Sequence, residues 1–307
     1  MKPCGQANIR KFKPNKSLGQ NFLVNQKVKQ QIISACNLAP EDIVLEIGPG
    51  RGEMTSEIAK KVKRVIAVEK DKNLAAILTQ NFAPPTECHV SEDVGEWRSG
   101  RDVARTSQSG ENSGDTTVKP RGSTDTNVEI INEDILKFNF TTLPVGIKVI
   151  GNLPYYITTP IIEEIVKHSK VIKECFFMVQ FEFAERVVAM PGGKEYGSLT
   201  LFLQYYCNPK ILAKVKNTAF SPKPKVDSCF LKLEIPAEPK YQVKDEKLLF
   251  RIIHSAFQQR RKTIMNSMSS VIKKEVLRDI LSKLSLSENL RAENLSIEDY
   301  IRISDLV

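Results

Sequence analysis

The sequence predicts an α/β protein in which a parallel sheet, covered by helices on both faces, is followed by a small all-helical domain. Two observations predict this architecture. Short apolar runs alternate with amphipathic stretches through the first half of the chain, as expected when crossover helices join parallel strands. From about residue 240 onward the periodicity is helical, without strand-like runs. We therefore expect one domain over 1–239 and a helical domain over 240–307.

The expected strands and helices alternate in order along the first domain. The run IVLEIG is short, apolar and ended by a Gly/Pro turn, which is typical of a buried strand, and the amphipathic EMTSEIAKKV follows it. The same succession of an apolar strand and an amphipathic helix then recurs along the chain. The expected strands cover 43–48, 64–69, 128–134, 147–154 and 174–180, and the expected helices cover 53–62, 72–82 and 158–168.

Residues 84–127 interrupt this order. The stretch is rich in Ser and Gly, carries mixed charges, has few apolar residues and contains Trp97, the single tryptophan of the chain. Such a composition buries little surface, so we expect a flexible insertion in a loop. A tolerated surface insertion and a partner-binding element are the two interpretations, and the first is favoured because loops accept added length at low cost.

Bulk properties indicate a protein of the cytoplasm that meets a polyanion. The 307 residues carry a formal net charge of +9, and no apolar run approaches the roughly 18 residues of a membrane span. The basic N-terminus lacks the apolar stretch of a signal peptide. Residues 2–29 hold Lys and Arg without any acid, and Arg260, Arg261 and Lys262 form a second cluster. Each cluster is equally consistent with solvated surface and with phosphate contacts.

The cysteines indicate neither a metal site nor a disulfide framework. None of the six forms a CxxC pair, and the three histidines do not fall near them. We expect reduced, mostly buried thiols and no bound metal.

A glycine-rich turn after the first expected strand indicates a nucleoside cofactor. The segment 46–52 reads Glu-Ile-Gly-Pro-Gly-Arg-Gly and opens a helix, so Gly48 and Gly50 can bring backbone amides against a ligand. Glu69 ends the next strand, where a carboxylate can accept both ribose hydroxyls. A dinucleotide and S-adenosylmethionine both remain possible ligands, beside a turn that binds nothing. The GxGxG spacing and the carboxylate of Glu46 favour the cationic S-adenosylmethionine.

A third acidic residue ends the strand 128–134. Asp134 is placed to accept a hydrogen bond from the adenine amine of the cofactor. The alternative is a helix N-cap, because ILKF follows it. After two matching strand ends we favour the ligand role.

The sequence Asn-Leu-Pro-Tyr at 152–155 closes another expected strand. An adenine amine is a poor nucleophile because its lone pair is delocalised into the ring. The side-chain oxygen of Asn152 and the backbone carbonyl of Leu153 can draw it toward tetrahedral geometry, in line with a sulfonium methyl. Pro154 would rigidify the turn, and Tyr155 would stack on the base. A plain strand-ending turn is the alternative.

Phe220 directly precedes the sequence SPKPKV, whose prolines would stiffen the chain that follows Phe220. It is a candidate for the opposite face of a clamp on the target base. A core position is an equally good interpretation of this residue.

With these motifs assembled, the chain resembles the bacterial KsgA-type (RsmA) small-subunit rRNA adenine N(6),N(6)-dimethyltransferases. The resemblance covers nearly the whole chain apart from 1–15 and 84–127. It rests on KSLGQNFL (16–23), EIGPGRGEMT (46–55), VEKD (68–71), NEDIL (132–136), NLPYYITTPII (152–162), FSPKPKVDS (220–228), FQQRRKTIMNSM (257–268) and RAENLSIEDY (291–300). The insertion 84–127 is the main departure from the family pattern.

The resemblance implies a Rossmann-like class I S-adenosylmethionine methyltransferase domain with a C-terminal helical domain. It implies that two adjacent adenosines in a hairpin near the 3′ end of small-subunit (16S) rRNA are dimethylated during maturation of the subunit. The cofactor-binding residues would be Asn21, Leu23, Gly48, Gly50, Glu69, Asp134 and Asn152. The segment containing Arg260, Arg261 and Lys262 would contact rRNA. We expect a monomer with no membrane contact.

Two other functions compete with this one. The related Erm-type enzymes modify large-subunit rRNA, although NLPYYITTP and FQQRRKTIMNSM favour the small-subunit type. A non-catalytic ribosome-assembly factor that binds RNA would explain the basic clusters. It has no need of Glu69, Asp134 and the 152–155 motif, so we favour the enzyme.

Overall fold

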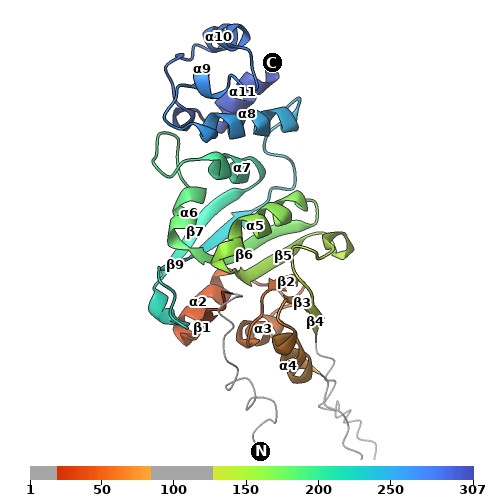
Figure 1. Cartoon of the computed structure of the whole chain (residues 1–307). Helices are drawn as coiled ribbons and strands as arrows, with labels where there is room; N and C mark the ends of the chain where they lie inside the picture. Colours follow the sequence, from red (N-terminus) through yellow and green to blue (C-terminus); the bar gives the residue numbers. More distant parts are fainter. Residues whose placement is uncertain (1–18, 84–126) are drawn as a thin grey trace, which may run out of the picture.

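The computed structural model describes residues 19–83 and 127–307 (Figure 1). The N-terminal arm through residue 18, with most of the first basic cluster, lies outside the described residues. So does the expected insertion up to residue 126, including Trp97.

A seven-stranded sheet forms the centre of the molecule, in the order β4-β3-β2-β5-β6-β9-β7. The strands are β2 (Ile43–Ile47), β3 (Arg64–Glu69), β4 (Val128–Asn132), β5 (Ile147–Asn152), β6 (Ile172–Gln180), β7 (Asn208–Val215) and β9 (Ser228–Glu234). Pairing is parallel from β4 through to β6. The predicted α/β class is confirmed, and every strand expected from the sequence is present.

The expectation of a wholly parallel sheet is wrong at one strand. β9 runs antiparallel to both β6 and β7. It follows β7 after the connection 216–227, which contains no α-helix to carry the chain back across the sheet, as parallel neighbours usually require. Both β7 and β9 were missed by the sequence analysis. A two-stranded pair outside the main sheet joins β1 (Phe22–Leu23) to β8 (Phe220–Ser221).

Helices cover both faces of the sheet. α2 (Gln26–Ala35) and α3 (Glu53–Ala59) pack on one face, and α5 (Thr158–Lys167), α6 (Phe181–Val187) and α7 (Ser198–Tyr206) on the other. α4 (Lys72–Phe82) lies against β4 and β3. Residues of a strand alternate between the faces, so that Val44 joins the first core and its neighbour Leu45 the second.

The C-terminal part is helical, as expected. α8 (Glu246–Gln258), α9 (Ile264–Ser267), α10 (Lys274–Lys283) and α11 (Ile297–Asp305) share a separate apolar core. Figure 1 shows them beside α7, at the end of the molecule away from β1, α3 and α4. α7 belongs to both parts, because Leu203 packs in the sheet core and Leu201 in the helical core. The division at residue 240 stays a proposal.

The four cysteines in the described part of the chain are buried thiols. Cys36, Cys175, Cys207 and Cys229 are buried, free thiols, as expected, and burial raises the pKa of Cys36 to about 12. Cys4 and Cys88 lie outside the described residues. Within 19–83 and 127–307, no helix combines the length and the apolar character that a membrane crossing requires.

A buried lysine on β5 fixes the sheet to the loop before β2. Lys148 Nζ lies 2.9 Å from Asp42 and 3.7 Å from Glu174, and it donates to the Asn37 carbonyl at 2.6 Å. Removing this buried cation leaves Asp42 without its counter-charge, although Glu174 keeps Lys232 at 2.6 Å. An uncompensated buried charge costs more than the pair contributes.

We therefore predict that Lys148→Met lowers the free energy of unfolding by about 3 kcal/mol. The measurement is urea denaturation followed by circular dichroism. The control is Lys60→Met, which removes an exposed pair with Glu57 and should change the same free energy by less than about 1 kcal/mol. Equal effects of the two substitutions would contradict the assignment of Lys148 as a buried ionic support.

Candidate active site

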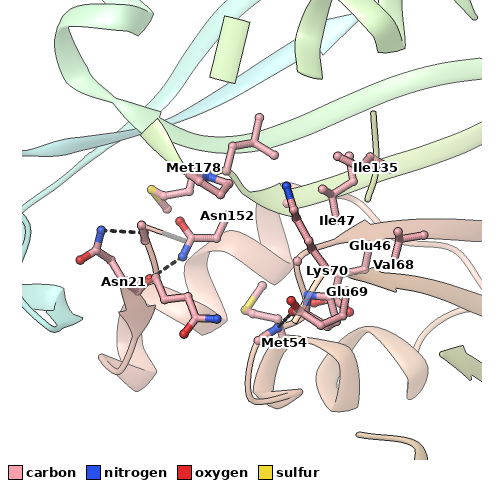
Figure 2. Close-up of a pocket in the computed structure, with 18 of the residues that line it drawn as sticks. Asn21, Glu46, Ile47, Met54, Val68, Glu69, Lys70, Ile135, Asn152 and Met178 are labelled. Atoms are coloured by element: carbon pink, nitrogen blue, oxygen red, sulfur yellow. Dashed lines mark hydrogen bonds between the residues drawn. The ribbon is translucent and has the colours of Figure 1, made fainter. Parts of the chain in front are cut away.

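A pocket lies where the carboxyl ends of β2, β3 and β5 meet (Figure 2). The chain order of the sheet reverses between β2 and β5, and ligands of open α/β sheets bind at this point. Most of the site residues predicted from the sequence come together here. Those that line the pocket are Asn21, Leu23, Gly48, Gly50, Glu69, Asp134, Asn152, Leu153, Pro154 and Tyr155.

The glycine turn after β2 forms the floor of this pocket. Gly48 and Gly50 have φ of +65° and +57°, a region that L side chains rarely adopt. A Cβ at Gly50 would lie 3.0 Å from the ring of Phe22, whereas a Cβ at Gly48 would meet open space. Gly50 thus admits the aromatic ring above it, and Gly48 leaves room for a ligand.

Glu69 ties the end of β3 to this turn. Its carboxylate accepts from the Gly50 N–H at 3.1 Å and from the Asp71 N–H at 2.8 Å. Burial raises the pKa of Glu69, and these two hydrogen bonds partly offset that rise. The carboxylate is therefore held in a fixed position at the pocket wall, as recognition of a ribose requires.

Glu46 is the most deeply placed acid of the site. Its side chain is 3% exposed, and among the described residues its Oε2 has no hydrogen-bond partner. Burial raises the pKa of Glu46 to about 7, and the nearby charge of Glu69 adds to the rise. A buried carboxylate with one unpartnered oxygen in a ligand pocket favours a cationic group as its partner.

Asp134 makes the contact expected of a cap and also lies at the pocket, where its role as a ligand stays a prediction. Its Oδ1 accepts from the Leu136 N–H at 3.2 Å, as a cap would, while the residue also lines the pocket. Lys70 Nζ lies 2.8 Å from Oδ2 and lowers the pKa of Asp134. The sequence analysis did not anticipate Lys70, although it is part of the VEKD motif. A ligand amine at Asp134 must share this carboxylate with Lys70.

Asn152 has its side chain oriented by the segment 19–23, which we call the strap. The Asn152 Nδ2 donates to the Asn21 carbonyl at 2.7 Å (Figure 2). The other end of the amide, Oδ1, is thereby left as the acceptor. The side chain of Asn21 turns back to the Gly19 carbonyl at 3.2 Å, so the residue meets Asn152 through its backbone.

The rest of the 152–155 motif is held by its own backbone. The Leu153 N–H donates to the Met178 carbonyl at 3.1 Å, and the Leu153 side chain is buried. The Pro154 carbonyl accepts from the Ile157 N–H at 3.2 Å and opens the 3₁₀ turn η3 (Tyr155–Ile157). The backbone that presents the Leu153 carbonyl is thus held on both sides.

Of the two aromatic candidates, the pocket contains one. Tyr155 is half-buried, lines the pocket and shares a hydrogen bond of 2.6 Å with Ser228 Oγ. Phe220 is 4% exposed, packs in the core with α2 and α3, and is absent from the pocket lining. Its backbone pairs with Leu23. The structure thus matches the core interpretation of Phe220, and a clamp role stays a prediction that requires its ring to move.

The strap is fastened over the pocket by side chains that the sequence did not single out. Gln20 Nε2 donates to Asp71 Oδ2 at 3.2 Å. The guanidinium of Arg51 lies 4.6 Å from the centre of the Phe22 ring, within the range of a cation–π contact. Together with the pairing of β1 with β8, these contacts hold the strap on the glycine turn.

The basic cluster at 260–262 divides into two kinds of residue. Arg260 donates to the carbonyls of Lys194 and Tyr196 at 2.9 and 3.2 Å and lies 3.9 Å from Glu293. It therefore joins the loop before α7 to the helical part. All three residues are exposed, so it is these contacts, and not burial, that distinguish Arg260 from Arg261 and Lys262. The predicted contact with RNA phosphates suits these two better than Arg260.

Comparison with known proteins gives one consistent family. The family model described as "Ribosomal RNA adenine dimethylase" matches residues 11–112 and 115–307. A protein of Alkaliphilus metalliredigens named "Ribosomal RNA small subunit methyltransferase A" is 37% identical over 303 residues, which cover 96% of this chain and 92% of that protein.

Two solved structures share the fold over most of the chain. A dimethyladenosine transferase from Plasmodium falciparum superimposes with a TM-score of 0.69 at 23% identity and covers 92% of this chain and 95% of its own. The 23S rRNA methyltransferase ErmE gives a TM-score of 0.64 at 22% identity, with 93% and 99% covered.

The raised pKa of Glu46 predicts pH-dependent ligand binding. Below pH of about 7 the carboxyl group takes up a proton and loses its attraction for a cation. We expect the affinity for S-adenosylmethionine to fall between pH 8 and pH 6, as measured by calorimetry. Glu46→Gln should bind more weakly at pH 8 and show little pH dependence. Equal pH dependence in both proteins would contradict the assignment.

The stability of the ligand-free protein should depend on pH in the opposite direction to the affinity. The folded pKa of Glu46 lies above the ordinary value of 4.5, so the unfolded state binds fewer protons between pH 4.5 and about 7. The contribution of Glu46 to the free energy of unfolding therefore decreases as pH rises through this window. Glu46→Gln should flatten that part of the stability profile.

A second prediction concerns Arg260. Arg260→Ala should lower the free energy of unfolding by about 1–2 kcal/mol, because the Lys194 and Tyr196 carbonyls lose their donor. Arg261→Ala, at an exposed neighbour, should change it by less than about 0.5 kcal/mol. Denaturant unfolding of both variants decides the point, and equal losses would refute the distinction.

Proposed function

The chain belongs to the ribosomal RNA adenine dimethylase family, and on that basis we propose that it transfers methyl groups from S-adenosylmethionine to small-subunit rRNA. The acceptors are the exocyclic amines of two adjacent adenosines in a hairpin near the 3′ end, which become N(6),N(6)-dimethyladenosines. The observation that carries the proposal is the amide of Asn152, held by Asn21 with its oxygen available beside the pocket at the ends of β2, β3 and β5.

The residues of the pocket fit this cofactor. The buried carboxylate of Glu46, whose Oε2 has no partner among the described residues, suits a cationic amino acid, and the open space at Gly48 admits it. Glu69 and Asp134 line the same pocket, and in this proposal they accept hydrogen bonds from the ribose and the adenine of the cofactor. When bound, S-adenosylmethionine supplies a methyl group on a sulfonium, which needs neither a metal nor a covalent intermediate.

The protein then contributes positioning and electrostatics. Asn152 Oδ1 and the Leu153 carbonyl accept hydrogen bonds from the adenine amine and direct its lone pair toward the methyl carbon. The target base turns out of the RNA stack to enter the pocket, and Tyr155 stacks on it there. Because these acceptors lie on a fixed backbone, little reorganisation accompanies the reaction.

The small ribosomal subunit is favoured over the large one by sequence similarity. The relative named for small-subunit methylation is 37% identical over nearly the full chain, whereas ErmE, named for 23S rRNA, is 22% identical. The common fold does not separate these substrates. A role in RNA binding alone is less favourable, because the chain retains the buried carboxylates and the oriented amide.

We assign the contact with rRNA phosphates to Arg261 and Lys262 in the helical part, 240–307. In this proposal 1–239 binds the cofactor, and the protein acts as a monomer in the cytoplasm during maturation of the small subunit.

Asn152→Ala tests both the chemistry and the substrate. The proteins are incubated with S-adenosylmethionine and small subunits that lack the modification, and methylated adenosines are mapped by mass spectrometry. The unchanged protein should give two adjacent dimethyladenosines near the 3′ end. Asn152→Ala should react about a hundredfold more slowly, because one acceptor for the amine is lost.

The matched control is Asn208→Ala, at an exposed position of β7, which should react normally. Methylation of large-subunit rRNA in place of the small subunit would overturn the proposed substrate. Full activity of Asn152→Ala would overturn the catalytic assignment.

A further inference from the structure

Ser228 is the last residue of the FSPKPKVDS motif, and nothing in the chemistry above gives it a role. It is fully buried, with 0% of its surface exposed, although it lies at the edge of the sheet where the pocket opens. Its hydroxyl and that of Tyr155 are 2.6 Å apart, a short hydrogen bond between two side chains that are 73 residues apart in sequence.

The position of Ser228 is fixed by its neighbours on both sides. It is the first residue of β9, where it pairs with Gln180 of β6 and Val215 of β7. A residue in the interior of a sheet has little freedom to move. The serine oxygen is therefore a rigid point of attachment for the more mobile ring of Tyr155.

Tyr155 needs such an attachment because its backbone controls only one end of the ring. The residue begins the 3₁₀ turn η3, and its side chain can rotate about two bonds. A hydrogen bond at the phenolic oxygen, the atom farthest from the backbone, restrains the rotation about Cα–Cβ, which would swing this oxygen away from Ser228. The long axis of the ring then keeps one direction beside the pocket before any base arrives, while the ring can still turn about that axis.

We propose that Ser228 is a positioning residue, which holds the ring of Tyr155 at the place where it can stack on the target adenine. The inference rests on the proposed function, since it assigns a support to the residue that meets the base. Preorganisation of this kind lowers the entropy that RNA binding must overcome.

The segment 220–228 contacts both the strap and Tyr155 through its two ends. At one end, Phe220 pairs with Leu23 of the strap, and at the other end Ser228 holds Tyr155. The connection thus links the cover of the cofactor pocket with the platform for the base.

A double-mutant cycle tests the proposal. Ser228→Ala, Tyr155→Phe and the double variant are compared with the unchanged protein in methyl transfer to unmodified small subunits. Each single change should lower kcat/KM for RNA by about fivefold, the equivalent of one net hydrogen bond. The double variant should be no slower than either single one, because both changes remove the same bond. Calorimetry should show unchanged affinity for S-adenosylmethionine.

A second readout does not depend on methyl transfer. Burial raises the pKa of Tyr155, and the hydrogen bond with Ser228 lowers it again. In Ser228→Ala the pKa of Tyr155 should therefore rise further, as measured by NMR titration of ¹³C-labelled tyrosine. The Tyr155 signal is assigned from its absence in Tyr155→Phe. A loss of packing alone would not produce this shift.

Ser304→Ala is the control, because Ser304 is a buried serine of α11 whose hydroxyl has no hydrogen-bond partner among the described residues. It should change neither kcat/KM nor the titration of Tyr155. Multiplicative losses in the double variant, or an unchanged pKa of Tyr155 in Ser228→Ala, would overturn the inference. If the unchanged protein methylates no rRNA, the proposed function fails, while the titration still decides whether Ser228 holds Tyr155.

Discussion

The hydrogen bond from the Asn152 amide to the Asn21 carbonyl, 2.7 Å long, is the contact on which the rest of the site depends. A carbonyl can only accept, so this contact must use Nδ2 and leaves Oδ1 as an acceptor for a substrate amine. The same bond holds the strap over the pocket. One contact therefore joins the cover of the pocket to the group that would orient the methyl acceptor.

The topology of the sheet brings these parts to one edge. Parallel strands end at the same side, so the turn after β2, Glu69 at the end of β3 and Asn152 at the end of β5 lie around one pocket. The reversed strand β9 contributes to that edge with its first residue, because an antiparallel strand begins where its neighbours end. Ser228 reaches Tyr155 for this reason. A fully parallel sheet would place the end of β9 there, with a different connection to the strap.

The sequence predicted those parts of the site that depend on strand ends. Glu69, Asp134 and Asn152 were found because each follows a recognisable apolar run, and such ends converge. The pairing of Asp134 with Lys70, the attachment of Tyr155 to Ser228 and the internal contacts of Arg260 were not found. These contacts join residues that are not related by the spacing of a helix or a strand, so the local sequence does not indicate them. A charged residue at the end of a helix also looks the same in the sequence whether its side chain contacts a phosphate or a backbone carbonyl. β7 and β9 escaped detection because the alternation of strands and helices stops before them.

The most direct test of this account is the rate of methyl transfer by Asn152→Asp. The substitution keeps the shape and one acceptor oxygen of the side chain but replaces the Nδ2 donor with a second acceptor, which repels the Asn21 carbonyl. Single-turnover transfer to unmodified small subunits should be at least about tenfold slower than with the unchanged protein, since strap and amide are no longer joined. An unchanged rate would show that the donor, and with it the contact between Asn152 and the strap, is not required.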